Sequence, residues 1–534
     1  MSIVFERKEY ILQPKNSVKV AAVIVMTSIF ISRILGFVRE MLIASIFGRG
    51  IETDAFYAAF TIPDVMFYLL IGGTLSSAFI PVFMSYIAKD DEQKGWDIAS
   101  NFTNIIMICL IIFTVLGMIF TPYLVPLVAY KFKGEQLELT IRLTRIMFPA
   151  VAFTCLAGLQ AGILNAYHKF LASSFGPIAY NLGIIFSLIV LGKSYGIEGI
   201  AYGVVVSAFL NFIIQFFALS KKTLFYSWIF NLKQEGLNQI IRLAIPSIIG
   251  LSISQLNLII TQNMASGFDE GSITALRYAN ILMSLPVGIF AMGISTAIFP
   301  SLTRQVARDE MDDYKESFSL GIRTIFFITI PSSIGLLVLK DQIIRLLFAN
   351  GQFNENDVRI TAYVLLFFCI GIAFSGGVQL LIRGFYSIRD TITPLKIGAI
   401  TIILNIIFNL LFIKFSNLGI GGLSLATSLV SIFNMIALFL IFNKKIHGVN
   451  GRRIAKSFTK TLISSTIMGG VIYTMSTYAL FNTITKLGQT FEVFALMGIG
   501  ILIFTLFSML LKMEEMSYVV SIIKSKLRLP QNEL

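Results

Sequence analysis

The stretch Val20–Gly48 reads VAAVIVMTSIFISRILGFVREMLIASIFG, and its only charged residues are Arg33, Arg39 and Glu40. Apolar runs of about 20 residues recur along the chain, and each is long enough to cross a hydrocarbon core of roughly 30 Å. The chain has 534 residues, of which 56% are hydrophobic and 13% charged. Soluble domains are charged at about one residue in four. The sequence therefore predicts an all-α polytopic membrane protein.

Polar residues, glycines and prolines divide the apolar runs into about fourteen candidate transmembrane helices. The predicted helices are 18–47, 55–87, 99–129, 140–165, 172–192, 198–220, 238–265, 273–303, 318–339, 358–383, 393–414, 419–443, 457–480 and 490–511. Of the Lys and Arg residues in the connecting segments, twenty-two lie on the side of the N-terminus and eight on the other side. Since such residues accumulate in cytoplasmic loops, both termini are expected to be cytoplasmic.

Two segments look like copies of one element. LSSAFIPVFMSYIAKDDE (Leu75–Glu92) and ISTAIFPSLTRQVARDEM (Ile294–Met311) share a proline and a charged ending. The offset is constant, because position 294 minus 75 and position 300 minus 81 both give 219. Six spans return the chain to the same side, so the copies predict two parallel six-helix lobes around a central cavity, as in secondary transporters. Chance similarity between two apolar helix ends is the alternative.

The repeat and the spans together predict five parts of the chain. These are a cytoplasmic N-terminal segment (1–17), an N-lobe (18–222), a C-lobe (236–445), a C-terminal helix pair (456–512) and a cytoplasmic tail (513–534).

Arg33 lies deep within the first predicted span. It follows Lys19 by 14 residues and precedes Arg49 by 16, so about 20 Å of helix separates it from either charge. An arginine side chain snorkels over only part of that distance, so Arg33 must face protein, water or a ligand. Two interpretations stay open. Either helix carbonyls or Glu40 satisfy the guanidinium, or it binds an anion in a water-filled cavity.

Five other charged residues are candidates for the same site. Arg39 lies six residues further along, about 120° round an ideal helix, so it faces the same cavity only if the helix bends at Gly36. Alternatively, it snorkels to the far membrane face. Arg277 is the best candidate from the second lobe. Asp54 is a further candidate substrate-binding residue, and Asp64 and Glu40 are candidate charge partners or gate residues, although acids near a helix start also interact favourably with its dipole.

Several function classes are excluded. The net charge is +13, but the basic residues gather in loops on one side, which argues against nucleic-acid binding. Cys109, Cys155 and Cys369 lie in separate apolar runs and suggest neither disulfides nor a zinc site. The motifs GxxxxGK[ST], HExxH and GxSxG do not occur. We therefore predict no enzymatic activity, no cofactor and no metal, and we assign no coupling ion.

Specific motifs are spread along nearly the whole chain. They include SRILGFVRE (Ser32–Glu40), TDAF (Thr53–Phe56), GFYSIRDTITPLKI (Gly384–Ile397) and GIGGLSLATS (Gly419–Ser428). With these motifs the chain resembles the MurJ/MviN lipid II flippase family of the multidrug/oligosaccharidyl-lipid/polysaccharide exporter superfamily.

The resemblance implies two six-helix lobes in a V, with two C-terminal helices forming a groove. It implies a substrate, the undecaprenyl-pyrophosphate-linked disaccharide-pentapeptide of cell-wall synthesis, carried by alternating access to the outer leaflet of the bacterial cytoplasmic membrane. Arg33, Arg39 and Asp54 match functional positions of the family. Membrane lipids are further expected partners, and the cell-wall synthesis machinery is a candidate partner.

The chain departs from the family pattern at two places. Where the family has PNLLRR, this chain has PDVMFY, so Phe67 or Tyr68 replaces an arginine. Where the family has ADRLMEFP, this chain has ANILMSLP, so Ile281 replaces another. Arg277 lies one helical turn before Ile281 on the same face and is a candidate substitute.

Four other functions compete with lipid II transport. A flippase for another polyprenyl-linked oligosaccharide fits the same features. A drug or cation antiporter of the superfamily should carry acids in its cavity, and here the first span carries arginines. An enzyme acting on polyprenyl phosphates needs clustered acids for Mg²⁺ or a nucleophilic histidine at the membrane face, and neither is seen. A binding scaffold that moves nothing is the fourth.

Overall fold

The computed structural model describes residues 15–72, 78–89, 91–167, 169–219, 226–477 and 485–517. Every regular element within these ranges is a helix, which confirms the predicted all-α fold. The chain forms two compact units, residues 1–273 and residues 274–534. Most of the predicted terminal segments, 1–17 and 513–534, lies outside the described residues.

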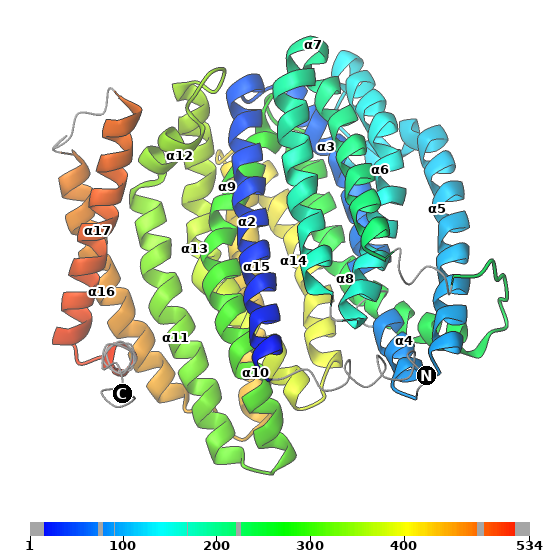
Figure 1. The fold of residues 1–534 in the computed structure, drawn as a ribbon. Helices are drawn as coiled ribbons and strands as arrows, with labels where there is room; N and C mark the ends of the chain where they lie inside the picture. Colours follow the sequence, from blue (N-terminus) through cyan, green and yellow to red (C-terminus); the bar gives the residue numbers. More distant parts are fainter. Residues whose placement is uncertain are drawn as a thin grey trace, which may run out of the picture. The chain divides into compact units, whose positions relative to one another are not determined.

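The first unit is built around α6, which packs against α3, α5 and α7 (Figure 1). Its elements are α2 (Lys15–Phe47), α3 (Ile51–Phe67), the π-helix η1 (Tyr68–Gly72), α4 (Ile80–Ile87), α5 (Glu92–Val128), α6 (Gly134–Ala166), α7 (Phe170–Leu219) and α8 (Glu235–Ala265). α2 packs on α7, and α8 packs on α5.

The second unit is built around α11 and α13. Its elements are α9 (Ser272–Pro286), which starts at the boundary, the π-helix η4 (Val287–Ala291), α10 (Met292–Ala307), α11 (Met311–Val338), α12 (Lys340–Phe348), α13 (Glu355–Ser387), α14 (Ile392–Phe415), α15 (Gly421–Lys445), α16 (Gly451–Thr477) and α17 (Lys486–Leu510). Buried side chains of α11, α13 and α15 share one core with α10 and the start of α16. The two compact units place α8 in the first unit. The predicted lobes, 18–222 and 236–445, were drawn from the sequence repeat and place α8 in the second, and they stay a prediction.

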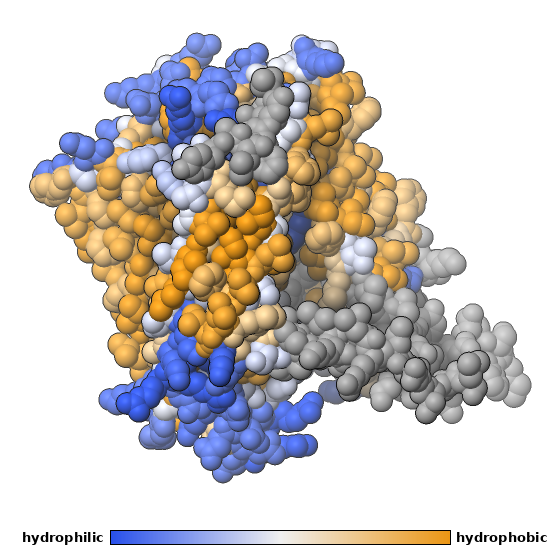
Figure 2. All heavy atoms as spheres, turned by 90° about the vertical axis from the view of Figure 1, so that its left-hand side faces the viewer, coloured by the Kyte–Doolittle hydropathy of each residue, from blue (hydrophilic) through white to orange (hydrophobic). Residues whose placement is uncertain are grey.

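The described residues contain ten helices long and apolar enough to cross a membrane. On the face drawn in Figure 2, hydrophobic residues form a band with hydrophilic residues at both ends. α2 is not among the ten, because the part of it whose side chains are described contains three charged residues, Arg33, Arg39 and Glu40. Three charges are too many for this part to count as apolar. The predicted number of fourteen is not confirmed.

α7 is two helices joined at a kink. A straight helix of its 50 residues would measure about 75 Å, more than twice the roughly 30 Å of a hydrocarbon core. Gly196 breaks the helix with φ 57° and ψ −143°, a conformation that glycine adopts at low cost. The two parts correspond to the predicted helices 172–192 and 198–220.

A π-helix begins at the same distance before each copy of the sequence repeat. η1 begins at Tyr68 and η4 at Val287, and 287 minus 68 gives 219, the offset of the repeat. Each follows an α-helix, α3 or α9, and precedes another, α4 or α10. Residues 73–77, at the start of the first sequence copy, lie outside the described residues. The matching π-helices support the duplication independently of residue identities.

The C-terminal helix pair is fixed to the second unit by a buried ion pair. Nη1 of Arg323, on α11, lies 2.9 Å from Oε1 of Glu515, and the two side chains are only 4% and 3% exposed. Ser457 of α16 donates a second hydrogen bond to Glu515. Glu514 is more exposed and bonds both Arg453 and Arg323, which together hold the pKa of its carboxyl below the usual range.

We expect Arg323→Ala to lower the free energy of unfolding in detergent by about 3–5 kcal/mol, because Glu515 would stay buried without its cation. Arg453→Ala is the matched control, since it removes an arginine whose pair with Glu514 is 44% and 55% exposed, and it should cost about 0–1 kcal/mol. Equal losses in the two variants, measured by thermal or denaturant unfolding, would contradict a buried pair at Arg323.

Candidate functional site

Arg33 lies on the exposed face of α2. Its side chain is exposed, as are the nearby Phe30 and Ile34. Within the described part of the chain, no hydrogen bond or ion pair engages its guanidinium, and Glu40 in particular is not its partner. The structure therefore shows no partner for Arg33 among the described residues, and its anion-binding role stays a prediction.

Arg39 lies in a different environment on the same helix. Its Nη2 is 2.6 Å from Oε1 of Glu40, with side chains 15% and 4% exposed. The hydroxyl of Tyr57, on α3, donates to Oε2 of Glu40 at 2.6 Å. Both carboxylate oxygens of Glu40 are therefore occupied, and the pair joins α2 to α3. Since a buried carboxylate without a cation is costly, Arg39 neutralises Glu40 here.

Asn181 of α7 completes this network. Its side-chain oxygen accepts a hydrogen bond from Nη1 of Arg39 at 3.3 Å, and its amide nitrogen donates to the backbone oxygen and the hydroxyl of Ser32. Its amide also lies against Gly36. Ser32, Gly36 and Arg39 are four and three residues apart, so they lie on one face of α2. This face packs on α7. Arg33 and Arg39 thus occupy different faces of one continuous helix, and α2 spans the Gly36 position without interruption.

Asp54 holds the segment that follows α8. Its side chain is buried, and its Oδ2 accepts the backbone N–H of Gly271 at 2.8 Å. Arg49 donates to the carbonyl of Glu270 at 2.6 Å. A Cβ on Gly271, where φ is 81°, would lie 2.4 Å from Cγ of Arg49 and 2.9 Å from its backbone carbon, so a larger residue does not fit. Asp54 therefore has a structural partner within the first unit.

The remaining predicted residues are half-buried. Asp64 lies near the end of α3. The charges of Asp64 and Arg39 both interact with the side chain of Tyr180. Phe67 is the last residue of α3 and contacts the exposed Tyr68 edge to face. Arg277 and Ile281 lie one turn apart on α9 in the second unit.

Sequence reasoning singled out neither Tyr57 nor Asn181. Both are polar side chains within otherwise apolar spans, which is the signal that could have identified them. What it could not supply was their pairing, because Tyr57 and Asn181 are 17 and 142 positions from their α2 partners. Chemically, α2 combines the exposed guanidinium of Arg33 with a neutralised Arg39–Glu40 pair. The exposed guanidinium is the kind of group that binds an anion.

Comparisons with known proteins agree on one family. A family model described as Lipid II flippase MurJ matches residues 43–492. A probable lipid II flippase MurJ from Buchnera aphidicola subsp. Acyrthosiphon pisum is 32% identical over 474 residues, covering 86% of this chain and 91% of the relative. A solved lipid II flippase MurJ in an inward closed conformation superposes with a TM-score of 0.78 at 27% identity, covering 91% and 98% of the two chains.

A second solved structure shows a wider likeness of fold. It is an inward-facing multidrug resistance MATE family transporter of the MOP superfamily, with a TM-score of 0.68 at 16% identity, covering 78% and 94% of the two chains.

The exposure of Arg33 can be tested by thiol labelling. In a background where Cys109, Cys155 and Cys369 are replaced, Arg33→Cys should react with a small water-soluble thiol reagent. Ser28→Cys, on the same helix but at a position only 9% exposed, should react much more slowly. An unreactive thiol at position 33 in the folded protein would show that this face of α2 meets lipid or protein instead of water.

Proposed function

The chain belongs to the lipid II flippase MurJ family, and from this premise we propose that it carries lipid II, the undecaprenyl-pyrophosphate-linked peptidoglycan precursor, across the bacterial cytoplasmic membrane. Movement runs from the inner to the outer leaflet. The observation that carries the proposal is the exposed guanidinium of Arg33 in the middle of a long apolar helix, on a different face from the Arg39–Glu40 pair, which is already neutral.

The physical task is to shield a pyrophosphate from hydrocarbon. Moving an ion out of water costs several kcal/mol or more even after relaxation. An arginine replaces part of the lost hydration, because its planar, permanently charged fork donates two hydrogen bonds to phosphate oxygens. In this proposal Arg33 supplies that fork in the first lobe and Arg277 supplies it in the second.

Transport is proposed to proceed by alternating access of two lobes, residues 18–222 and 236–445. The polyprenyl tail stays in lipid or beside the helix pair 456–512. Both termini are cytoplasmic in this proposal, which rests on the excess of Lys and Arg on that side. The protein makes and breaks no covalent bond, so it is not an enzyme. The cell-wall synthesis machinery is proposed as a partner on the side that receives lipid II.

Competing functions have less support. The likeness to the multidrug transporter, at 16% identity, concerns the fold alone. A flippase for another polyprenyl-linked oligosaccharide would use the same guanidinium, so a transport assay must compare head groups.

Loss of Arg33 should disable transport without unfolding the protein. In proteoliposomes with fluorescent lipid II, we expect Arg33→Ala to slow flipping by about 10- to 100-fold. This rate ratio corresponds to the free energy of one charge-assisted hydrogen bond. Arg33→Lys should be intermediate, because an ammonium lacks the bidentate geometry. Arg242→Ala, at an exposed arginine of α8, should remain near wild type. Wild-type rates in Arg33→Ala would exclude the phosphate role.

The second-lobe charge can be moved along its helix. If Arg277 replaces the arginine missing at position 281, Arg277→Ala should abolish flipping, and Arg277→Ala combined with Ile281→Arg should restore part of it. The shift is about 6 Å, since four residues rise 1.5 Å each. If Arg277 only anchors the helix start near headgroups, lysine would serve equally well. Full activity of both Arg277→Ala and Arg277→Lys would therefore refute its role.

A further inference from the structure

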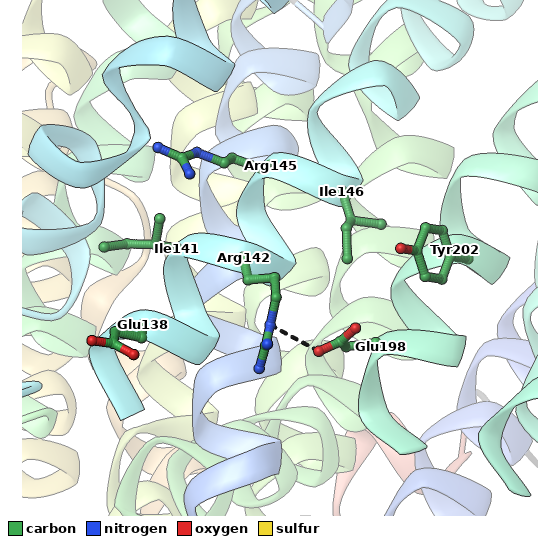
Figure 3. A pocket seen from close by; sticks show the side chains of 7 residues that line it. All are labelled: Glu138, Ile141, Arg142, Arg145, Ile146, Glu198 and Tyr202. Carbon is green, nitrogen blue, oxygen red and sulfur yellow. Dashed lines mark ion pairs between the residues drawn. The ribbon is translucent and has the colours of Figure 1, made fainter. Parts of the chain in front are cut away.

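A cavity of about 370 Å³ opens between α6 and the second part of α7, and none of its lining residues belongs to α2. It is lined by Glu138, Ile141, Arg142, Arg145, Ile146, Glu198 and Tyr202 (Figure 3). Two cations and two anions thus share one small opening with apolar and aromatic side chains. None of the four charged residues belongs to the transport site described above.

The cavity lies at the end of the apolar part of both helices. The stretch after Arg145, residues 146–166, holds 21 residues without a charge, and so does the stretch after Glu198, residues 199–219. Each measures about 31 Å as a helix and therefore crosses the hydrocarbon core by itself. Arg142, Arg145 and Glu198 are consequently placed at the depth of the lipid headgroups.

Exposed tyrosines mark the same boundary. Tyr130 follows the end of α5 and is 67% exposed, and Tyr195 precedes the kink of α7 and is 65% exposed. Tyr202, in the cavity wall, is 47% exposed. Tyrosine is enriched where hydrocarbon meets water, because its ring is apolar and its hydroxyl is polar.

The charged groups keep donors and acceptors available. Nε of Arg142 lies 2.8 Å from Oε1 of Glu198, with the arginine side chain 62% exposed, and Figure 3 marks this pair. Nε of Arg145 donates to the carbonyl of Met118 at 3.1 Å. These bonds orient both guanidinium groups and leave their terminal N–H groups unused by the described residues. Glu138 precedes Arg142 by one helical turn and likewise has no partner among them.

We propose that this cavity binds the headgroup of an aminophospholipid, a phosphoethanolamine ester. The lipid lies in the leaflet at the N-terminal end of α6. The phosphate accepts hydrogen bonds from Arg145 and Arg142, and the ammonium group donates to Glu138. A purely anionic ligand would meet two carboxylates, and a purely cationic one would meet two guanidinium groups. A zwitterion satisfies both signs. The acyl chains then follow the apolar surface beyond Ile146 and Tyr202.

Choline lipids fit the same charges less well. Their quaternary ammonium carries no N–H, so it cannot donate a hydrogen bond to Glu138. The site should therefore distinguish phosphatidylethanolamine from phosphatidylcholine, and its carboxylates should disfavour phosphatidylglycerol.

Native mass spectrometry of the full-length protein tests this. The protein is exposed to an equimolar mixture of phosphatidylethanolamine, phosphatidylcholine and phosphatidylglycerol, and the retained lipids are counted. Wild type should retain several-fold more phosphatidylethanolamine than either other lipid. Glu138→Gln and Arg145→Gln should lose that preference. Glu135→Gln, on the same helix outside the cavity, should keep it. Equal retention of the three lipids, or an unchanged preference in both cavity variants, would overturn the proposal.

A chain-free competitor separates a lipid from a soluble zwitterion. Glycerophosphoethanolamine carries the same headgroup without acyl chains, and it should fail to displace the retained lipid at equal concentration. Efficient displacement would show that a soluble zwitterion is the natural occupant and would refute the lipid. Flipping of lipid II is not part of either readout, so failure here leaves the proposed transport function unaffected.

Discussion

Hydrocarbon provides no hydrogen-bond partners, and this constraint acts on every polar group of the chain that enters it. Backbone N–H and C=O groups satisfy each other within α-helices. Side-chain hydroxyls follow the same rule. Thr121 and Thr329 are fully buried, and each donates to the carbonyl one turn earlier, at 2.7 Å in both cases. Polar residues can therefore lie inside a span without a partner from another helix.

Charged groups obey the constraint differently, because no helix carbonyl neutralises a carboxylate. Glu40 and Glu515 are both nearly inaccessible, and each has an arginine within 3 Å, at 2.6 and 2.9 Å, and a hydroxyl donor. These pairs join helices and are closed to other ligands. Arg33 is the contrasting case. Its guanidinium is exposed and has no counter-ion among the described residues. The proposed role in binding an anion depends on this difference.

The all-α fold was predictable from sequence, because runs of uncharged residues must match the thickness of the membrane. For the same reason the break at Gly196 falls between two predicted spans, 172–192 and 198–220, whereas the short helix α12 was not predicted. The separate roles of Arg33 and Arg39 were only partly predictable. Their angle of about 120° follows from helix geometry, but which face meets α7 depends on Asn181, far away in the chain. Arg142 was overlooked, since it lay inside a predicted span and its partner Glu198 belongs to another helix.

The two π-helices bear on how the sequence repeat arose. A π-turn bonds i to i+5, so it holds one residue more than the α-helical turn it replaces. Two separate insertions at the same place in η1 and η4, 219 positions apart, would be a coincidence. A single insertion before duplication explains both. If the two halves arose by duplication, their common ancestor already carried the irregular turn.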